Sequence, residues 1–194
     1  MALLPVSKRR EYFEYCGLGN YCRANILKMQ KMYMLRKSDW DGVYGKDSDA
    51  LLRHLRNVKK YASKNFVPEE FRCGCGGKYC CGYPTRMKAK ELKHIQTIRT
   101  HYGRPMTITS GLRCDKYNAE VGGVPDSRHK TGYAVDFVIK GMTDTLAGRK
   151  KVIKYAMKLK NHHYSYGNGC KTSDSKIVSI YSPTMGNAVH TDTK

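Results

Sequence analysis

The hydrophobic and polar positions follow a helical period in the first third of the chain. Apolar or core-compatible residues recur at helical spacing at Ile26, Leu27, Met29, Gln30, Met34 and Leu35, and again at Ala50, Leu51, Leu52, Leu55 and Val58. This spacing predicts two amphipathic helices, joined by the turn-rich loop at 39–48. Asp47 or Ser48 is expected to cap the second helix, with Asp49 in its first turn. We therefore predict a small helical domain at residues 1–65.

Residues 66–194 mix helical and strand patterns. The expected elements are helices at 87–102 and 145–159 and strands at 105–109, 134–139, 177–181 and 188–190. Pro68 ends any preceding helix, and Gly103 ends the first of the new ones. Because helices and strands do not alternate in regular βαβ order, we predict an α+β domain with an antiparallel or mixed sheet flanked by helices.

The charge of the chain points to an anionic partner. Lys and Arg number 36 against 16 Asp and Glu, for a formal charge of +20 over 194 residues, and the excess is spread along the whole chain. No zinc-finger pair, ribonucleoprotein motif or heptad-bearing basic helix is visible, which argues against nucleic acid. The bacterial wall, with its teichoic acids and peptide carboxylates, is the other candidate.

Targeting signals are not evident in the sequence. The N-terminal MALLPVSKRR has too short an apolar run for a secretory signal. No later segment approaches the ~18 to 20 apolar residues that span a bilayer. We expect a protein without a membrane span that is made and kept soluble in a cytoplasm.

The chain has eight cysteines, which without a signal argue against a disulfide framework. Four lie in the glycine-rich run CGCGGKYCC, namely Cys73, Cys75, Cys80 and Cys81. Such a run could hold a structural zinc or another soft metal, and Cys114 could join it, although the spacing is not a common zinc-ribbon spacing. The alternative is a thiol-rich connector without metal.

The stretch 110–136 carries the candidate chemistry in the pattern S-x-H-x-x-G-x-A-x-D. It places His129 and Asp136 close together in sequence, with Asp136 on a predicted strand where a buried carboxylate needs a cation. A catalytic zinc uses three protein ligands and keeps one position open, so we predict His190 as the third ligand. The remaining histidines are interpreted as surface or core residues: His54, His94, His101, His162 and His163.

These residues, with ITSGLRC at 108–114, YN at 117–118 and VGGVP at 121–125, resemble zinc peptidases of the D-Ala-D-Ala carboxypeptidase type. That group belongs to the superfamily of lysostaphin-like enzymes and the hedgehog domain. The resemblance covers residues 66–194. It implies a zinc metallopeptidase, of carboxypeptidase or endopeptidase type, that hydrolyses amide bonds of peptidoglycan stem peptides. Zinc would polarise the carbonyl and make hydroxide available at neutral pH.

The resemblance also suggests roles for neighbouring residues. Arg113 matches the arginine of the family's S-G-Y-R block and could bind a substrate carboxylate or the oxyanion, or be a surface residue. Ser127 could bind substrate or cap its loop. Relatives often carry a carboxylate three residues before the last histidine, where this chain has Asn187. Asp192 is then the nearest carboxylate, either as the general base or as a residue that orients a ligand.

The N-terminal loop DGVYG, followed by Ser48 and an apolar helix, resembles small three-helix peptidoglycan-binding domains. The alternative is a helical hairpin that only stabilises the catalytic part. The combination implies a bacteriophage endolysin, present in the host cytoplasm before release to the wall, or a virion-associated lysin. A non-catalytic protein that keeps the fold and binds the wall or nucleic acid is the alternative that Asn187 favours.

Overall fold

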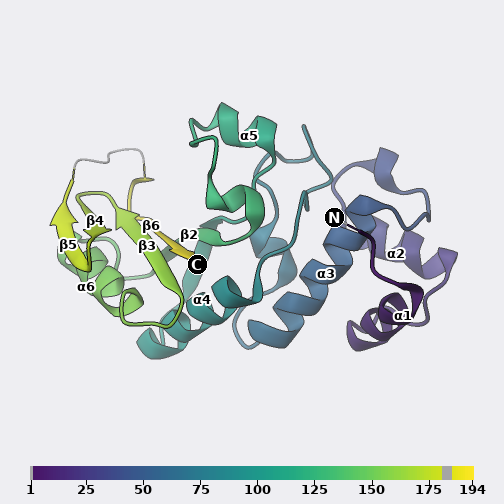
Figure 1. Cartoon of the computed structure of the whole chain (residues 1–194), viewed down its shortest axis with the longest axis horizontal. Helices are drawn as coiled ribbons and strands as arrows, with labels where there is room; N and C mark the ends of the chain where they lie inside the picture. The colour runs from purple at the N-terminus through teal and green to yellow at the C-terminus, as the bar shows by residue number, and fades with distance from the viewer. Residues whose placement is uncertain (1, 181–184) are drawn as a thin grey trace.

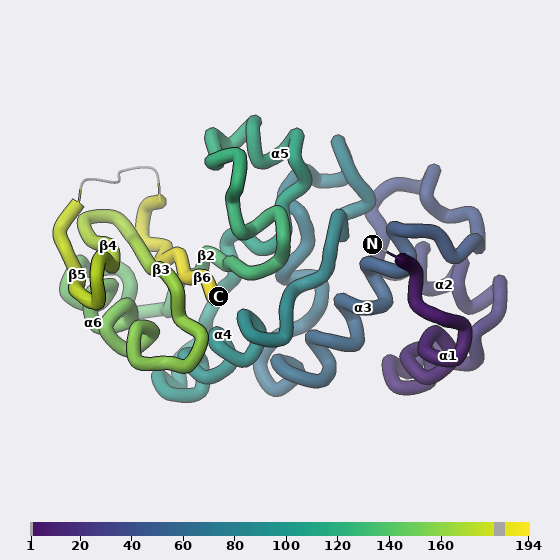
Figure 2. Tube along the Cα trace, viewed as in Figure 1, coloured from purple at the N-terminus to yellow at the C-terminus, as the bar shows by residue number. Residues whose placement is uncertain are grey.

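The computed structural model describes residues 2–180 and 185–194. Three helices form one end of the elongated molecule, α1 (Val6–Tyr15), α2 (Arg23–Tyr33) and α3 (Lys46–Tyr61). Figure 1 shows them opposite the end that carries the sheet, with α4 (Ala89–Tyr102) and α5 (Asp115–Glu120) between the two. Figure 2 shows the C-terminus near the middle of the molecule, where the Lys194 carbonyl accepts a hydrogen bond from Lys90 at 2.9 Å.

The sheet has six strands within the described residues, in the order β1-β2-β6-β3-β4-β5, and all of their pairings are antiparallel. The strands are β1 (Met106–Ser110), β2 (Ala134–Ile139), β3 (His162–Gly167), β4 (Cys170–Ser173), β5 (Lys176–Ser179) and β6 (Val189–Thr193). Helix α6 (Leu146–Ala156) packs against β3 to β6 and against α4. The predicted α+β fold is confirmed, and the sheet is antiparallel rather than mixed.

Most predicted elements are present. The helix at 87–102 corresponds to α4, and Gly103 ends it with the predicted left-handed conformation at φ 61°. The helix at 145–159 corresponds to α6, for which Thr145 supplies the N-cap oxygen. The four predicted strands correspond to β1, β2, β5 and β6, although Tyr181, at the end of the third, lies outside the described residues.

The predicted cap of α3 is wrong. The N-cap is Gly45, so Asp47 and Ser48 lie inside the first turn. The Asp47 and Asp49 carboxylates there suit the positive end of the helix dipole. Asp49 is buried and accepts hydrogen bonds from the Leu4 amide and the Tyr44 hydroxyl, at 2.7 and 3.0 Å. The Asp49 carboxylate therefore anchors α3 and also fixes the start of the chain.

Helices α1 and α5 and strands β3 and β4 were not predicted. Helix α1 has a polar sequence and buries only Phe13, so it shows no apolar stripe. Strand β3 reads HHYSYG, with histidine and tyrosine where the pattern for a strand requires aliphatic residues. These elements are held by tertiary packing rather than by a strong local signal.

The central strands separate two faces of the sheet. Because side chains alternate along a strand, Val135 and Phe137 of β2 point to the hydrophobic core, together with Val189 of β6. The intervening Asp136 and His190 point to the opposite face. The candidate ligands therefore lie on a rigid layer whose other side is covered by α4 and α6.

The N-terminal helices pack closely on the rest of the chain. Their apolar residues belong to the same continuous core as those of the sheet and α4. The His54 ring is fully buried and lies 3.0 Å from the Pro68 carbonyl, and Asn57 donates to the Met87 carbonyl at 2.9 Å. The division at residues 65 and 66 stays a prediction. Among the described residues, no helix is long and apolar enough to cross a membrane.

Glu91 on α4 gives a stability prediction. It is fully buried, and neither carboxylate oxygen has a hydrogen-bond partner among the described residues. Burial raises its pKa well above the usual range. The nearby Thr193 side chain lowers this pKa only in part, and the Asp192 and Asp136 charges raise it further. The folded protein therefore holds this proton. The contribution of protonated Glu91 to the stability of the fold is present below the usual carboxyl pKa and is lost as the pH rises through the raised pKa.

We expect Glu91→Gln to stabilise the protein by about 1–3 kcal/mol at high pH, since it removes an unpaired buried carboxylate. The melting temperature should rise by about 2–4 °C per kcal/mol at about pH 8, with a smaller gain near pH 4. Melting curves across this range test it, with the exposed Glu14→Gln as the matched control. Parallel pH profiles for wild type and Glu91→Gln would contradict the assignment.

Candidate metal centre

Three predicted ligands meet on the open face of the sheet. Antiparallel pairing of β2 with β6 places Asp136 directly opposite His190, and the 3-10 turn η3 (Arg128–Thr131) brings His129 beside them. His129 Nε2 lies 3.3 Å from Asp136 Oδ1 and 3.2 Å from His190 Nδ1. His190 Nδ1 lies 2.7 Å from Asp136 Oδ1. All three side chains are buried.

This trio fits a tetrahedral zinc. Bond lengths of about 2.0–2.1 Å to nitrogen and oxygen place the ligand atoms of one tetrahedral face about 3.3–3.4 Å apart. Two of the three observed separations match that value, and the third is a shorter hydrogen-bond distance. Two imidazole nitrogens and one carboxylate oxygen are also the ligand types that a catalytic zinc uses.

Neighbouring groups orient both imidazoles. His129 Nδ1 donates to the Gly111 carbonyl at 2.7 Å, which leaves the Nε2 lone pair directed at the other two ligands. On His190, Nδ1 faces the trio, and Nε2 lies 3.4 Å from Asp192 Oδ2. Asp192 is therefore on the far side of the His190 ring from Asp136 and His129.

Gly132 of the sequence pattern allows the turn between His129 and β2. Its φ is 77°, and a Cβ at this position would lie 2.1 Å from the Arg86 carbonyl oxygen. A larger residue would be strained and would also collide with the backbone. The spacing of the motif thus reflects a close backbone approach that sets His129 beside Asp136.

Arg113 completes the hydrogen bonds to Asp136. Its Nη2 donates to Asp136 Oδ2 at 2.7 Å and its Nε donates to Ser110 Oγ at 2.9 Å. The carboxylate is thereby divided, with Oδ1 toward the imidazoles and Oδ2 toward the guanidinium. Ser127 lies at the N-cap of η3, but its side chain makes no capping hydrogen bond.

The electrostatics of the site favour a cation. Burial alone would raise the pKa of Asp136, but hydrogen bonds from His129 and His190 outweigh it and hold this pKa well below the usual range. Burial would also raise the pKa of Asp192, which His190 and His163 lower instead. Burial lowers the pKa of His129. Two buried carboxylates thus stay ionised on either side of His190. Burial would lower the pKa of His190, but its hydrogen bonds to Asp136 and Asp192 raise it instead, so this imidazole and the Arg113 guanidinium supply positive charge beside the carboxylates.

A groove opens beside Asp136, the member of the trio that lines it. Among the described residues it is lined by Thr109, Ser110, Arg113, Val121, Gly122, Gly123, Asp136, Val138, Tyr166, Met185, Asn187 and Ala188. Asp136 is the only carboxylate in this set, and Ser127 is not part of it. Asn187, where relatives often carry a carboxylate, does lie at the groove and donates to Asp144 Oδ1 at 3.3 Å.

Two residues of this region were missed by the sequence analysis. Tyr166 stacks on the His190 ring with centroids 4.5 Å apart, and burial together with the Asp136 charge raises its pKa to about 12. His163, interpreted as a surface or core histidine, has its Nδ1 2.6 Å from Asp192 Oδ1. The alternating aromatic residues of β3 were the available signal, because they place Tyr164 and Tyr166 on one face of a strand.

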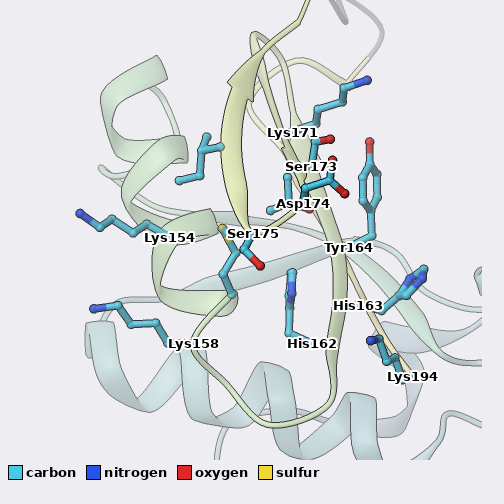
Figure 3. A pocket seen from close by; sticks show the side chains of 13 residues that line it. Lys154, Lys158, His162, His163, Tyr164, Lys171, Ser173, Asp174, Ser175 and Lys194 are labelled. Carbon is cyan, nitrogen blue, oxygen red and sulfur yellow. The ribbon is translucent and has the colours of Figure 1, made fainter.

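A second, basic hollow lies beside β3, β4, β5 and α6. Figure 3 shows lysines around its edge, contributed by Lys154, Lys158, Lys171 and Lys194. His163 also lines it and thus connects it with Asp192. This hollow and the groove beside Asp136 share no lining residue among those described.

The cysteine run forms a separate group. The sulfur atoms of Cys73, Cys75, Cys80 and Cys114 all lie within 4.8 Å of one another, and we call them the cysteine cluster. The prediction that Cys81 belongs to it is wrong, whereas Cys114 does join. Cys81 is buried elsewhere, with its sulfur near Asp39 and Asp47 and accepting from the Tyr83 amide at 3.4 Å.

Comparison with known protein families gives a match over the middle of the chain. A family model described as Peptidase M15 matches residues 64–168. The match includes Arg113, His129 and Asp136 and ends before His190. No curated protein matches the chain.

We expect Asp192→Asn to weaken zinc binding by about 10- to 100-fold, because the variant loses the carboxylate that orients His190. His129→Ala, which removes a ligand, should abolish binding at this site. Titration against a chelator measures both, with the exposed Asp126→Asn as the matched control. A wild-type affinity for Asp192→Asn would exclude the orienting role.

Proposed function

The chain belongs to the peptidase M15 family, and we propose that it is a zinc-dependent peptidase that hydrolyses amide bonds in the stem peptides of bacterial peptidoglycan. Family membership makes it a metallopeptidase, and thus a hydrolase. The observation that carries the finer proposal is the convergence of His129, Asp136 and His190. Of these, Asp136 lines a groove that Arg113 also lines.

The zinc would be held by His129 Nε2, Asp136 Oδ1 and His190 Nδ1. Bound there, it supplies a Lewis acid for the scissile carbonyl and hydroxide at neutral pH. The chain's own residues then have to bind the peptide, orient it and stabilise the charge that develops on the carbonyl oxygen.

Arg113 and Tyr166 are the donors available for that purpose. Arg113 uses two of its nitrogens to hold Ser110 and Asp136, and its side chain lines the groove, where a remaining N–H can donate to a substrate carboxylate or the oxyanion. With a pKa of about 12, Tyr166 remains protonated and acts as a donor. Donors directed at the developing charge commonly give the largest single contribution to amide hydrolysis.

The geometry favours one of the two roles considered for Asp192. Its Oδ2 contacts the outer nitrogen of His190 and its Oδ1 contacts His163, so both oxygens face away from the groove. A general base must reach the attacking water. We propose that Asp192 orients His190 and keeps its Nδ1 directed at the metal.

We further propose that the basic surface holds the enzyme on the wall, and that the protein acts as a bacteriophage endolysin or virion-associated lysin. Support comes from the family, from the +20 formal charge and from the likeness of the N-terminal helices to wall-binding domains. Peptidoglycan carboxylates and teichoic acid phosphates are the matching anions.

A second function is favoured by Asn187. An amide lies at the groove where relatives often carry a carboxylate, and Asp136 is the one carboxylate among the described lining residues. An amide cannot accept the proton of an attacking water. The alternative is therefore a protein that binds wall peptides through the groove without cleaving them.

Digestion of purified sacculi separates these two functions. We expect the zinc-loaded wild type to release fragments in which mass spectrometry finds newly cleaved stem peptides and intact glycan strands. Tyr166→Phe should lower turnover by about 10²- to 10³-fold with unchanged zinc content, since it removes one donor to the oxyanion. A zinc-loaded wild type that binds sacculi and cleaves nothing would support the binding protein, and Asn187→Glu would then be tested for gain of activity.

Wall binding should be electrostatic and should involve the N-terminal helices. Raising the salt from 0.1 to 1 M shortens the Debye length from about 10 to about 3 Å, and sacculus binding should fall accordingly. Close packing on the core makes a truncation at residue 66 unsuitable. Charge reversal on the exposed surface is the better experiment.

Two triple variants give the same change in net charge on different surfaces. One reverses exposed residues of the N-terminal segment, Lys28→Glu, Lys31→Glu and Lys37→Glu, and the other reverses the basic hollow, Lys154→Glu, Lys158→Glu and Lys171→Glu. We expect the first to weaken sacculus pull-down more, with turnover of a soluble stem peptide unchanged. A larger loss for the second would move wall binding to the hollow of Figure 3.

A further inference from the structure

We propose that the cysteine cluster binds a structural zinc ion in addition to the ion at the groove. Its four sulfur atoms come from two segments that are distant in sequence. Three belong to the loop at 73–82, and Cys114 directly precedes α5. All eight cysteines are free thiols.

The cluster has the dimensions of a tetrathiolate site. Zinc–sulfur bonds of about 2.3 Å in a tetrahedron place the four sulfur atoms about 3.8 Å apart. The Cys75 and Cys80 sulfurs lie 3.5 Å apart, and all the sulfur atoms lie within 4.8 Å of one another. Soft thiolates in tetrahedral arrangement select zinc or an iron–sulfur cluster, and a set of this size suits a single ion.

The loop is shaped to bring its three cysteines together. The Cys73 amide donates to the Gly82 carbonyl at 2.7 Å and closes the loop, and the Lys78 amide donates to the Cys75 carbonyl at 3.0 Å. Gly76 and Gly77 adopt positive φ of 61° and 90°, which a residue with a side chain rarely accepts. The glycine-rich sequence therefore serves a tight turn with the sulfurs on its inner side.

A backbone amide points at one of the sulfur atoms. The Cys114 amide donates to the Cys73 sulfur at 3.3 Å, which links the two segments directly. Such a donor stabilises the thiolate, the form in which cysteine binds a metal.

A zinc at this position would fix the walls of the groove. Cys114 follows Arg113, whose guanidinium holds Asp136. On the other side of the loop, the Phe71 carbonyl accepts from the Leu112 amide at 2.8 Å. The ion would thus clamp the 110–114 segment, which carries both Arg113 and the Gly111 carbonyl that orients His129.

Metal analysis of the full-length protein, purified under reducing conditions, tests the site independently of the groove. We expect His129→Ala to retain one zinc per chain, and Cys75→Ser with Cys114→Ser in that background to retain none. Cys81→Ala, outside the cluster, is the matched control and should keep the zinc content of its parent. Cobalt substituted into His129→Ala should show strong sulfur-to-cobalt charge-transfer absorption, which needs no cysteine variant to fold.

The outcomes separate this site from the proposed catalytic one. If the groove binds no metal, wild type and His129→Ala both hold one zinc, and the cysteine site stands. If His129→Ala holds no zinc and gives no charge-transfer band, the cysteine site is overturned. A Cys75–Cys80 disulfide that persists under the reducing conditions of purification, detected by mass spectrometry, would overturn it as well. Chelator treatment of His129→Ala should also lower its melting temperature, because zinc binding to the native state stabilises it.

Discussion

The pairing of β2 with β6 is the constraint on which the candidate centre depends. It joins strands that are more than fifty residues apart and sets Asp136 opposite His190 in a fixed antiparallel register. A slip of β6 by one residue would turn His190 into the apolar layer beneath α4 and α6 and away from Asp136. Val135, Phe137 and Val189 prevent that slip, because they bury their side chains on the core face. The hydrophobic core therefore positions the polar site.

The same register buries two carboxylates, whose negative charge a metal ion would offset. His190 lies between Asp136 and Asp192, and both carboxylates are removed from water. Arg113 and His163 compensate the outer oxygens, while the inner Asp136 oxygen and the two imidazoles face one another. Burying like charges is costly unless a cation or hydrogen bonds offset them. The arrangement therefore suits a bound cation.

The remainder of the molecule holds this site from behind and from the side. Helices α4 and α6 cover the core face of the sheet, and the N-terminal helices continue the same core through buried contacts such as Asn57 to Met87. The cysteine loop contacts the 110–114 segment at the side of the groove. The segments that line the groove consequently have several independent attachments, as a preorganised site requires.

Local patterns in the sequence determined the main helices, four of the strands, the α+β class and the identity of the three candidate ligands. These features depend on short-range rules: apolar periodicity, the glycine that ends α4, and residue types that bind metals. Helix α1 and strand β3 were not predicted, because their polar and aromatic residues give a weak local signal.

Only the tertiary structure decided which distant groups meet. It placed Asp192 behind His190 rather than at the groove, with His163 against Asp192 and Tyr166 stacked on the His190 ring. It also placed Cys114, and not Cys81, in the cysteine cluster. Each of these outcomes depends on strand register or on the packing of a loop against a distant segment. Such contacts are set by the whole core, so no short stretch of sequence contains them.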